Sequence, residues 1–98
     1  MPNADALLPR ASESVVCASV SEGAILYSGD TERYFGINGV GELVWQLLGE
    51  CSTEGELYAR MQERFPDVPR ERIQTDVREL LDELLRFGLV QLPRPTIA

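Results

Sequence analysis

Residues 33–48 read RYFGINGVGELVWQLL, and the spacing of the apolar side chains changes within this stretch, near Asn38. Before Asn38 the short aromatic run is typical of a β-strand. Asn38 itself is a residue type that caps helix N-termini. After it, apolar side chains recur at the three- and four-residue spacing of one helix face: Val40, Leu43, Val44, Leu47 and Leu48. The stretch therefore predicts a strand that leads directly into a helix.

Two further strands are expected upstream of this stretch. Residues 14–20 are rich in valine and small side chains, and residues 24–27 form a second apolar run. Ser28-Gly29-Asp30-Thr31 separates this run from residues 33–37, and Gly and Asp tolerate the positive φ that tight hairpins need. Three strands joined by short turns predict an antiparallel meander.

Downstream of residue 48 the sequence predicts two more helices. Thr53 and Glu56 have the spacing of a capping box, and the helix that they open is expected to run to Phe65. Pro69 suits the first turn of the last helix, whose apolar positions are Ile73, Val77, Leu80, Leu81, Leu84 and Leu85. Gly88 is expected to end it, with residues 89–92 packing or pairing afterwards. The fold class is therefore α+β: a winged-helix-like arrangement of a three-stranded antiparallel β-meander followed by three helices, in the order βββααα.

The chain is long enough for one domain and its core. It has 98 residues, of which 44% are hydrophobic. Residues 1–12 are expected to form a flexible N-terminal lead-in, residues 13–92 the folded domain, and residues 93–98 a C-terminal tail. No stretch approaches the ~20 apolar residues that span a bilayer. The N-terminus also lacks the charged start and apolar run of a signal peptide, so the sequence predicts a cytoplasmic protein without a membrane partner.

The composition argues against most enzyme classes. The chain contains no histidine, so catalysis and metal binding by histidine are excluded within it. Cys17 and Cys51 stand alone, outside any CxxC pair, and are expected to be reduced and partly buried. The acids Glu79, Asp82 and Glu83 suit a solvated helix face better than a catalytic site. We therefore expect no enzymatic activity, catalytic residue, metal or cofactor.

DNA binding is the alternative that a winged-helix-like fold brings with it. The net charge of −7 argues against it, because affinity for phosphates comes from clustered basic residues. Residues 70–86, which would form the recognition helix of a transcriptional regulator, contain four arginines and five acids. Such a face repels phosphates about as much as it attracts them. The sequence thus predicts no nucleic-acid partner.

A peptide partner is the remaining interpretation. A strand at the edge of a small sheet has unpaired N–H and C=O groups, to which an extended peptide adds as a further strand. Residues 33–37 are short, aromatic and free of proline, as such a template requires. Composition leaves open whether Phe35 and Ile37 serve this role or only pack into the core.

Residues 33–48 also resemble the strand-to-helix signature of the PqqD-like family, in which an aromatic strand ends in a hydrophobic-Asn pair before an apolar-Trp-x-Leu-Leu helix. The later landmarks match in order and spacing, so that the resemblance covers about residues 14–92: Thr53-x-x-Glu56-Leu57, Val68-Pro69, Asp76-Val77, Leu80-Leu81, Leu84-Leu85 and Gly88-Leu89-Val90. The departures are small: Gly39 and Gly41 add glycine at the helix start, and Ile37 replaces the frequent leucine before Asn38.

The resemblance implies a non-catalytic domain that binds the leader segment of a ribosomally made precursor peptide and delivers it to modifying enzymes. In pyrroloquinoline quinone (PQQ) synthesis the enzyme is a radical SAM protein, and in lasso-peptide pathways it is a leader peptidase and a cyclase. The leader lies along the third strand, in a groove bounded by the third helix. Carried over to this chain, the expected peptide-binding residues are Arg33, Tyr34, Phe35, Gly36 and Ile37 on the strand, and Asp76, Val77, Arg78, Leu80, Leu81 and Leu84 on the helix. Arg33 and Arg78 are expected to pair with acidic leader residues.

Overall fold

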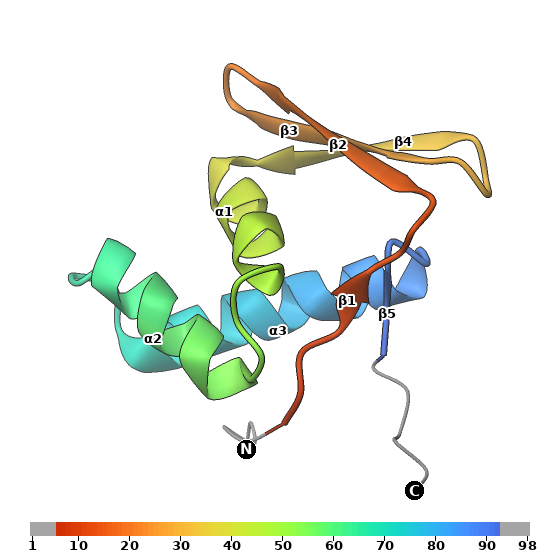
Figure 1. Ribbon diagram of the computed structural model, residues 1–98. Helices are drawn as coiled ribbons and strands as arrows, with labels where there is room; N and C mark the ends of the chain where they lie inside the picture. The colour runs from red at the N-terminus through yellow and green to blue at the C-terminus, as the bar shows by residue number, and fades with distance from the viewer. Residues whose placement is uncertain (1–5, 93–98) are drawn as a thin grey trace, which may run out of the picture.

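The computed structural model describes residues 6–92 and contains three helices and five short strands (Figure 1). The elements follow in the order β1 (Arg10–Ala11), β2 (Val15–Val20), β3 (Gly23–Ser28), β4 (Arg33–Asn38), α1 (Gly39–Leu48), α2 (Glu54–Arg64), α3 (Arg70–Arg86) and β5 (Val90–Gln91). The predicted α+β class, with a three-stranded antiparallel meander followed by three helices, is confirmed.

The main sheet has the strand order β2-β3-β4, and both pairings are antiparallel. Its register places Leu26 opposite Cys17 on one side and Phe35 on the other, so these three side chains share one face. Leu26 is fully buried, which identifies this face as the inner one. All three helices lie on the inner side of the sheet, and the outer face has no helix over it (Figure 1).

Local capping signals place the first and last residues of the helices close to where the sequence predicts them. The backbone N–H of Gly41 donates a hydrogen bond to Oδ1 of Asn38 (2.8 Å), so Asn38 is the N-cap of α1. The Thr53 hydroxyl accepts from the N–H of Glu56 (3.3 Å) at the start of α2. Gly88 follows α3 with φ of +71°, a conformation that favours glycine. Small differences remain: α2 ends one residue before Phe65, and Pro69 is the N-cap of α3 rather than part of its first turn.

The hydrophobic core lies between the sheet and the helices. Its most buried large side chains come from the N-terminal segment, β3, the helices and the segment after α3: Leu8, Leu26, Val44, Leu48, Leu57 and Leu89. Cys51 is buried beside them, and Cys17 packs against the core from β2. Both cysteines are free thiols, and burial is the main cause that raises the pKa of each. A thiol with a raised pKa is a poor nucleophile.

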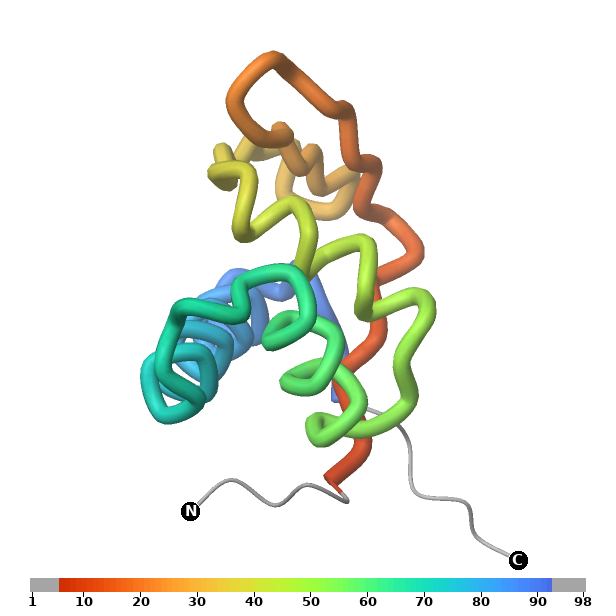
Figure 2. The backbone as a smooth tube through the Cα atoms, turned by 90° about the vertical axis from the view of Figure 1, so that its left-hand side faces the viewer, coloured from red at the N-terminus to blue at the C-terminus, as the bar shows by residue number. Residues whose placement is uncertain are grey.

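The N-terminal segment differs from the expected flexible lead-in, because residues 7–12 pack into the domain. Leu8 is buried, its backbone N–H bonds to the carbonyl of Ser52, and β1 pairs with β5 in a separate two-stranded sheet. The Ser12 hydroxyl also donates to the carbonyl of Gly88 (2.8 Å). Figure 1 shows β1 and β5 side by side, and Figure 2 shows the same two segments, in red and blue, from another side. The folded unit therefore begins before residue 13, and a two-residue strand is too short to be recognised in sequence.

The first five residues of the expected lead-in and the expected tail, residues 93–98, lie outside the described part of the chain. Within residues 6–92, none of the helices has the length and apolar character needed to cross a membrane.

Candidate functional site

Strand β4 forms one edge of the main sheet, and within residues 6–92 no strand pairs with the edge of β4 that faces away from β3. The backbone N–H and C=O groups on that side are consequently available to an added strand. β4 is six residues long and contains neither proline nor lysine, two residue types that commonly block edge pairing. The edge thus has the backbone properties that strand addition requires.

A groove runs between the end of β4 and α3. One wall comes from the β4–α1 junction, and the other comes from one side of α3. The lining residues are Gly36, Ile37, Asn38, Val40 and Gly41 on the first wall, and Asp76, Glu79, Leu80 and Glu83 on the second. The open edge of β4 therefore borders a depression that can receive the side chains of an added strand.

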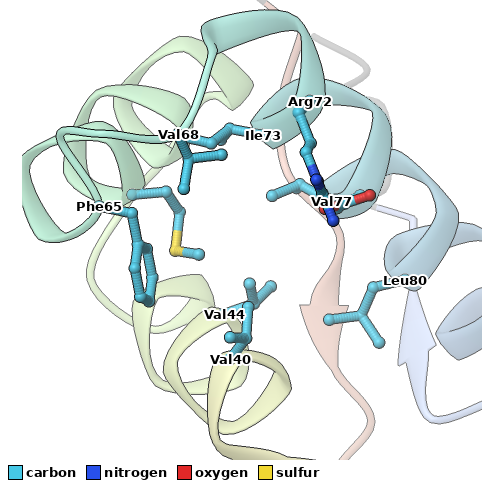
Figure 3. Close-up of a pocket in the computed structure, with 10 residues that line it drawn as sticks. Val40, Val44, Phe65, Val68, Arg72, Ile73, Val77 and Leu80 are labelled. Carbon is cyan, nitrogen blue, oxygen red and sulfur yellow. The ribbon is translucent and has the colours of Figure 1, made fainter.

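The groove adjoins an apolar hollow of about 370 Å³ between α1, α3 and the α2–α3 connection (Figure 3). Val40, Asp76 and Leu80 line both spaces, so the two adjoin along these residues. The other residues that line the hollow are Val44, Met61, Phe65, Val68, Arg72, Ile73 and Val77. A hollow lined this way favours an aliphatic or aromatic side chain.

The α3 wall of the groove is acidic. Asp76, Glu79 and Glu83 are all exposed along it. Asp76 and Glu83 form long, exposed ion pairs on α3, with Arg72 (3.7 Å) and Arg86 (3.9 Å), which hold them only weakly. Glu79 forms no ion pair with the residues that the structure describes. The wall is thus better suited to basic than to acidic side chains of a ligand.

An aromatic contact joins β4 to the end of α3 beyond the groove residues Gly36 and Glu83. The rings of Phe35 on β4 and Phe87 at the end of α3 lie 5.2 Å apart, and the guanidinium of Arg86 lies 5.1 Å from the centre of the Phe87 ring. These contacts tie the C-terminal end of α3 to the edge strand.

The structure separates the residues that the sequence predicts at the site. Gly36, Ile37, Asp76 and Leu80 line the groove, and Val77 lines the hollow. Leu81 and Leu84 are buried in the core instead. Phe35 faces inward and contacts Phe87, whereas Tyr34 points to the outer face of the sheet, where its ring lies 4.8 Å from that of Tyr27. Arg33 is exposed at the start of β4.

Arg78 does not face the groove and is held by a buried carboxylate of α2. Its Nη1 donates to both oxygens of Glu54 (3.0 and 3.1 Å), which is only 6% exposed. The Tyr58 hydroxyl donates to the same carboxylate (2.6 Å). Burial, and then this hydrogen bond, raise the pKa of Tyr58, while the bond to Glu54 raises the pKa of Arg78. In the chain without a leader, Arg78 therefore forms a contact between α2 and α3, and its pairing with a leader acid stays a prediction from the sequence.

Sequence reasoning missed several residues that the structure brings to the groove and hollow. These include Val40, Phe65, Val68, Ile73, Glu79 and Glu83. The sequence pattern places the acids only on a solvated helix face, because it does not state which side of α3 borders β4. Val40 belongs to the apolar stripe of its helix, where side chains are ordinarily buried. Only the structure shows that Val40 is exposed.

The comparisons with known proteins agree with this geometry. The family model described as coenzyme PQQ synthesis protein D (PqqD) matches residues 23–90. The structure of TbiB1 in complex with the TbiA(beta) leader peptide matches with a TM-score of 0.78 and 27% identity, covering 88% of this chain and 99% of TbiB1. A lasso peptide synthetase B1 complexed with its leader peptide matches with a TM-score of 0.70 and 21% identity, over 87% of this chain and 98% of that one. A search of curated proteins finds no match.

Proposed function

Because this chain belongs to the PqqD family, we propose that it binds the leader segment of a ribosomally made precursor peptide and delivers that precursor to a modifying enzyme. Domains of this family bind peptides and are not themselves catalysts. TbiB1, which matches nearly the whole domain, was solved with a leader peptide bound. The observation that carries the proposal is the open edge of β4 beside a groove and an adjoining apolar hollow.

The physical mechanism is strand addition. An extended leader pairs its backbone with the free edge of β4, which supplies affinity that depends little on sequence. Every second side chain of the added strand then points toward the groove. An apolar side chain entering the hollow supplies selectivity, because burying it releases water from both surfaces. The acidic wall formed by Asp76, Glu79 and Glu83 favours leaders with basic residues near that anchor.

Delivery follows from holding the precursor on a protein that also contacts the enzyme. Binding both partners raises the effective concentration of the precursor at the active site. We propose that the enzymes belong to a lasso-peptide pathway, a leader peptidase and a cyclase, because both matching structures are leader complexes and one is a lasso peptide synthetase component. A radical SAM enzyme, as in PQQ synthesis, is the alternative that the family name supports.

The structure offers no support for the alternative of a DNA-binding regulator. The side of α3 that borders the groove carries Asp76, Glu79 and Glu83. On the α2 side, Arg78 is already held by Glu54. A recognition helix with this charge pattern lacks the free basic cluster that phosphate binding needs.

The test first identifies the cognate precursor from the genes around the one for this chain, and then uses a synthetic leader of that sequence. Its affinity for wild-type protein is measured by fluorescence anisotropy, together with a series of leaders that each carry one N-methylated amide. Strand addition predicts that alternate N-methylations weaken binding, because only every second amide faces β4. Weakening that does not alternate, or no weakening, contradicts strand addition.

A matched pair of variants tests the position of the groove. Leu80→Glu places a carboxylate in the half-buried lining of both the groove and the hollow, and we expect at least a roughly tenfold loss of leader affinity. Ala59→Glu adds the same charge on the exposed side of α2 and is expected to leave affinity unchanged. Equal affinities of the two folded variants would place the leader elsewhere.

A further inference from the structure

The outer face of the main sheet is mostly apolar: among the strand positions on it, the polar exception is Asn38 at the end of β4, whose side chain caps α1. The register places Val16, Ala18 and Val20 of β2, Ile25 and Tyr27 of β3, and Tyr34 and Gly36 of β4 on this face, opposite the buried side chains of β3. None of the seven is an acidic or basic residue. In an antiparallel sheet with one solvated face, the outward positions are ordinarily polar.

These side chains are exposed in the isolated chain. Val16 is 63% exposed, Val20 50%, Ile25 39% and Tyr34 72%, and Figure 1 shows no helix over this side of the sheet. They account for half of the exposed large hydrophobic residues within residues 6–92. A contiguous apolar patch of this kind is often functional in a soluble protein.

We propose that this outer face, defined by the seven residues above, docks the enzyme that modifies the precursor; the inference rests on the proposed function. Three observations favour an enzyme over a second copy of this chain: the area of the face, the charge around it, and its continuity with the leader edge.

The area of the face is too small for a stable dimer. Three strands of six residues cover about 14 by 20 Å, or roughly 300 Å² on each partner. A standard interface buries about 800 Å² per partner. Two copies stacked through this face alone would therefore associate weakly at best, whereas a transient contact of this size suits the release of a delivered substrate.

Charge at the rim also disfavours self-association. Glu22 in the β2–β3 turn lies at one end of the face, and Asp30 and Glu32 in the β3–β4 turn lie at the other, where Arg33 offsets one of these charges and leaves the rim acidic. With a net charge of −7 on each chain, two copies would bring like charges together. The fitting partner has an apolar centre and basic side chains around it.

Continuity with the leader edge favours the modifying enzyme in particular. An added leader becomes a fourth strand next to β4, and the side chains that do not enter the groove point to the outer face beside Tyr34. The enzyme would then contact a surface formed jointly by this chain and its bound leader. Joint recognition enlarges the interface and favours the loaded complex over the empty protein.

The test compares two double variants that add the same charge. Val16→Glu with Val20→Glu alters the outer face, and Ala59→Glu with Thr75→Glu alters exposed positions on α2 and α3. The probes are the synthetic leader and the purified enzyme that modifies the same precursor. We expect both double variants to bind the leader like wild type. The loaded outer-face variant should bind the enzyme at least about tenfold more weakly than the loaded control.

Val16→Thr with Val20→Thr keeps the branched shape that suits strands, and so tests the face if the glutamates prevent folding. It is expected to weaken enzyme binding by a smaller factor. Equal enzyme affinity in outer-face and control variants overturns the inference while leaving the proposed function intact. A wild-type dimer in sedimentation velocity that is lost in the outer-face variant also overturns the inference. Loss of leader binding in the outer-face variant alone overturns it too. A wild-type chain that binds no leader overturns the proposed function itself.

Discussion

The Phe35 ring on β4 packs against the Phe87 ring at the C-terminal end of α3, with centroids 5.2 Å apart and planes tilted by 39°. Phe35 comes from the edge strand and Phe87 from the helix that forms the opposite wall. The pair therefore joins β4 to the end of α3 beyond the groove residues Gly36 and Glu83.

Phe87→Ala is expected to weaken both properties. Loss of the contact with Phe35 should lower the free energy of unfolding by about 1–2 kcal/mol, since Phe87 is 43% exposed and contributes less than a fully buried ring. Leader affinity should also fall several-fold, because α3 is no longer tied to β4. Chemical denaturation and fluorescence anisotropy measure the two effects. Phe87→Leu keeps an apolar contact, so its stability and leader affinity should lie between those of wild type and Phe87→Ala. Unchanged leader affinity in Phe87→Ala would show that the Phe35–Phe87 pair does not shape the groove.

Glu79→Gln is expected to weaken binding only of leaders with basic residues near their apolar anchor. The change removes the groove carboxylate that makes no ion pair within the described residues, and the expected loss is about two- to fivefold at low salt. Added salt should shrink the difference between variant and wild type. A leader whose basic residues are replaced by alanine should bind both proteins equally. A loss that persists with this leader would rule out the charge pairing.

Arg78→Ala is expected to reduce stability while leaving leader affinity unchanged. The substitution leaves the buried Glu54 carboxylate with Tyr58 as its remaining side-chain partner. Because Arg78 itself is about half exposed, we expect a cost of about 1–3 kcal/mol rather than that of a fully buried pair. Denaturation curves of Arg78→Ala, Glu54→Gln and the double variant measure the coupling. A large loss of leader affinity in folded Arg78→Ala would show that Arg78 contributes to leader binding.

Tyr58 is expected to make the protein less stable at alkaline pH. Burial raises the pKa of the Tyr58 phenol in the folded state above its ordinary value of about 10. The folded state thus holds this proton more tightly, and the stabilisation is complete below about pH 10 and is lost as pH rises further. The denaturation midpoint should fall more between pH 8 and a pH above 10 for the wild-type protein than for Tyr58→Phe. Both proteins contain the same two cysteines, so their difference isolates Tyr58; parallel pH profiles would contradict the prediction.

Gly23→Ala is expected to disrupt the sheet at the start of β3. Gly23 has φ of +152°, and an added Cβ would clash with the carbonyl oxygen of Ile37 on β4. We expect a loss of at least about 2 kcal/mol, measured by thermal and chemical unfolding. Gly36→Ala is the matched control, since an added Cβ there meets no atom within 4 Å. Comparable stability of the two variants would show that β3 and β4 can separate at this point without cost.

Much of the fold was predictable because its signals act over a few residues. Asn38 and Thr53 cap helices through hydrogen bonds to amides three positions away, and Gly88 ends α3 through its own backbone conformation. Residues 33–48 encode the passage from strand to helix in the spacing of their apolar side chains. Such signals are complete within one turn of chain, so they can be recognised without knowing what packs against them.

The binding surfaces depended on contacts between distant parts of the chain. Arg78 and Leu80 lie two positions apart on α3, yet one pairs with Glu54 on α2 and the other lines the groove beside β4. Nothing in their spacing states which side of the helix faces the sheet. Likewise, Arg10 and Ala11 form a strand only because the chain after α3 returns beside them. Local sequence determines which elements form, whereas packing between elements determines which side chains are left to meet a ligand.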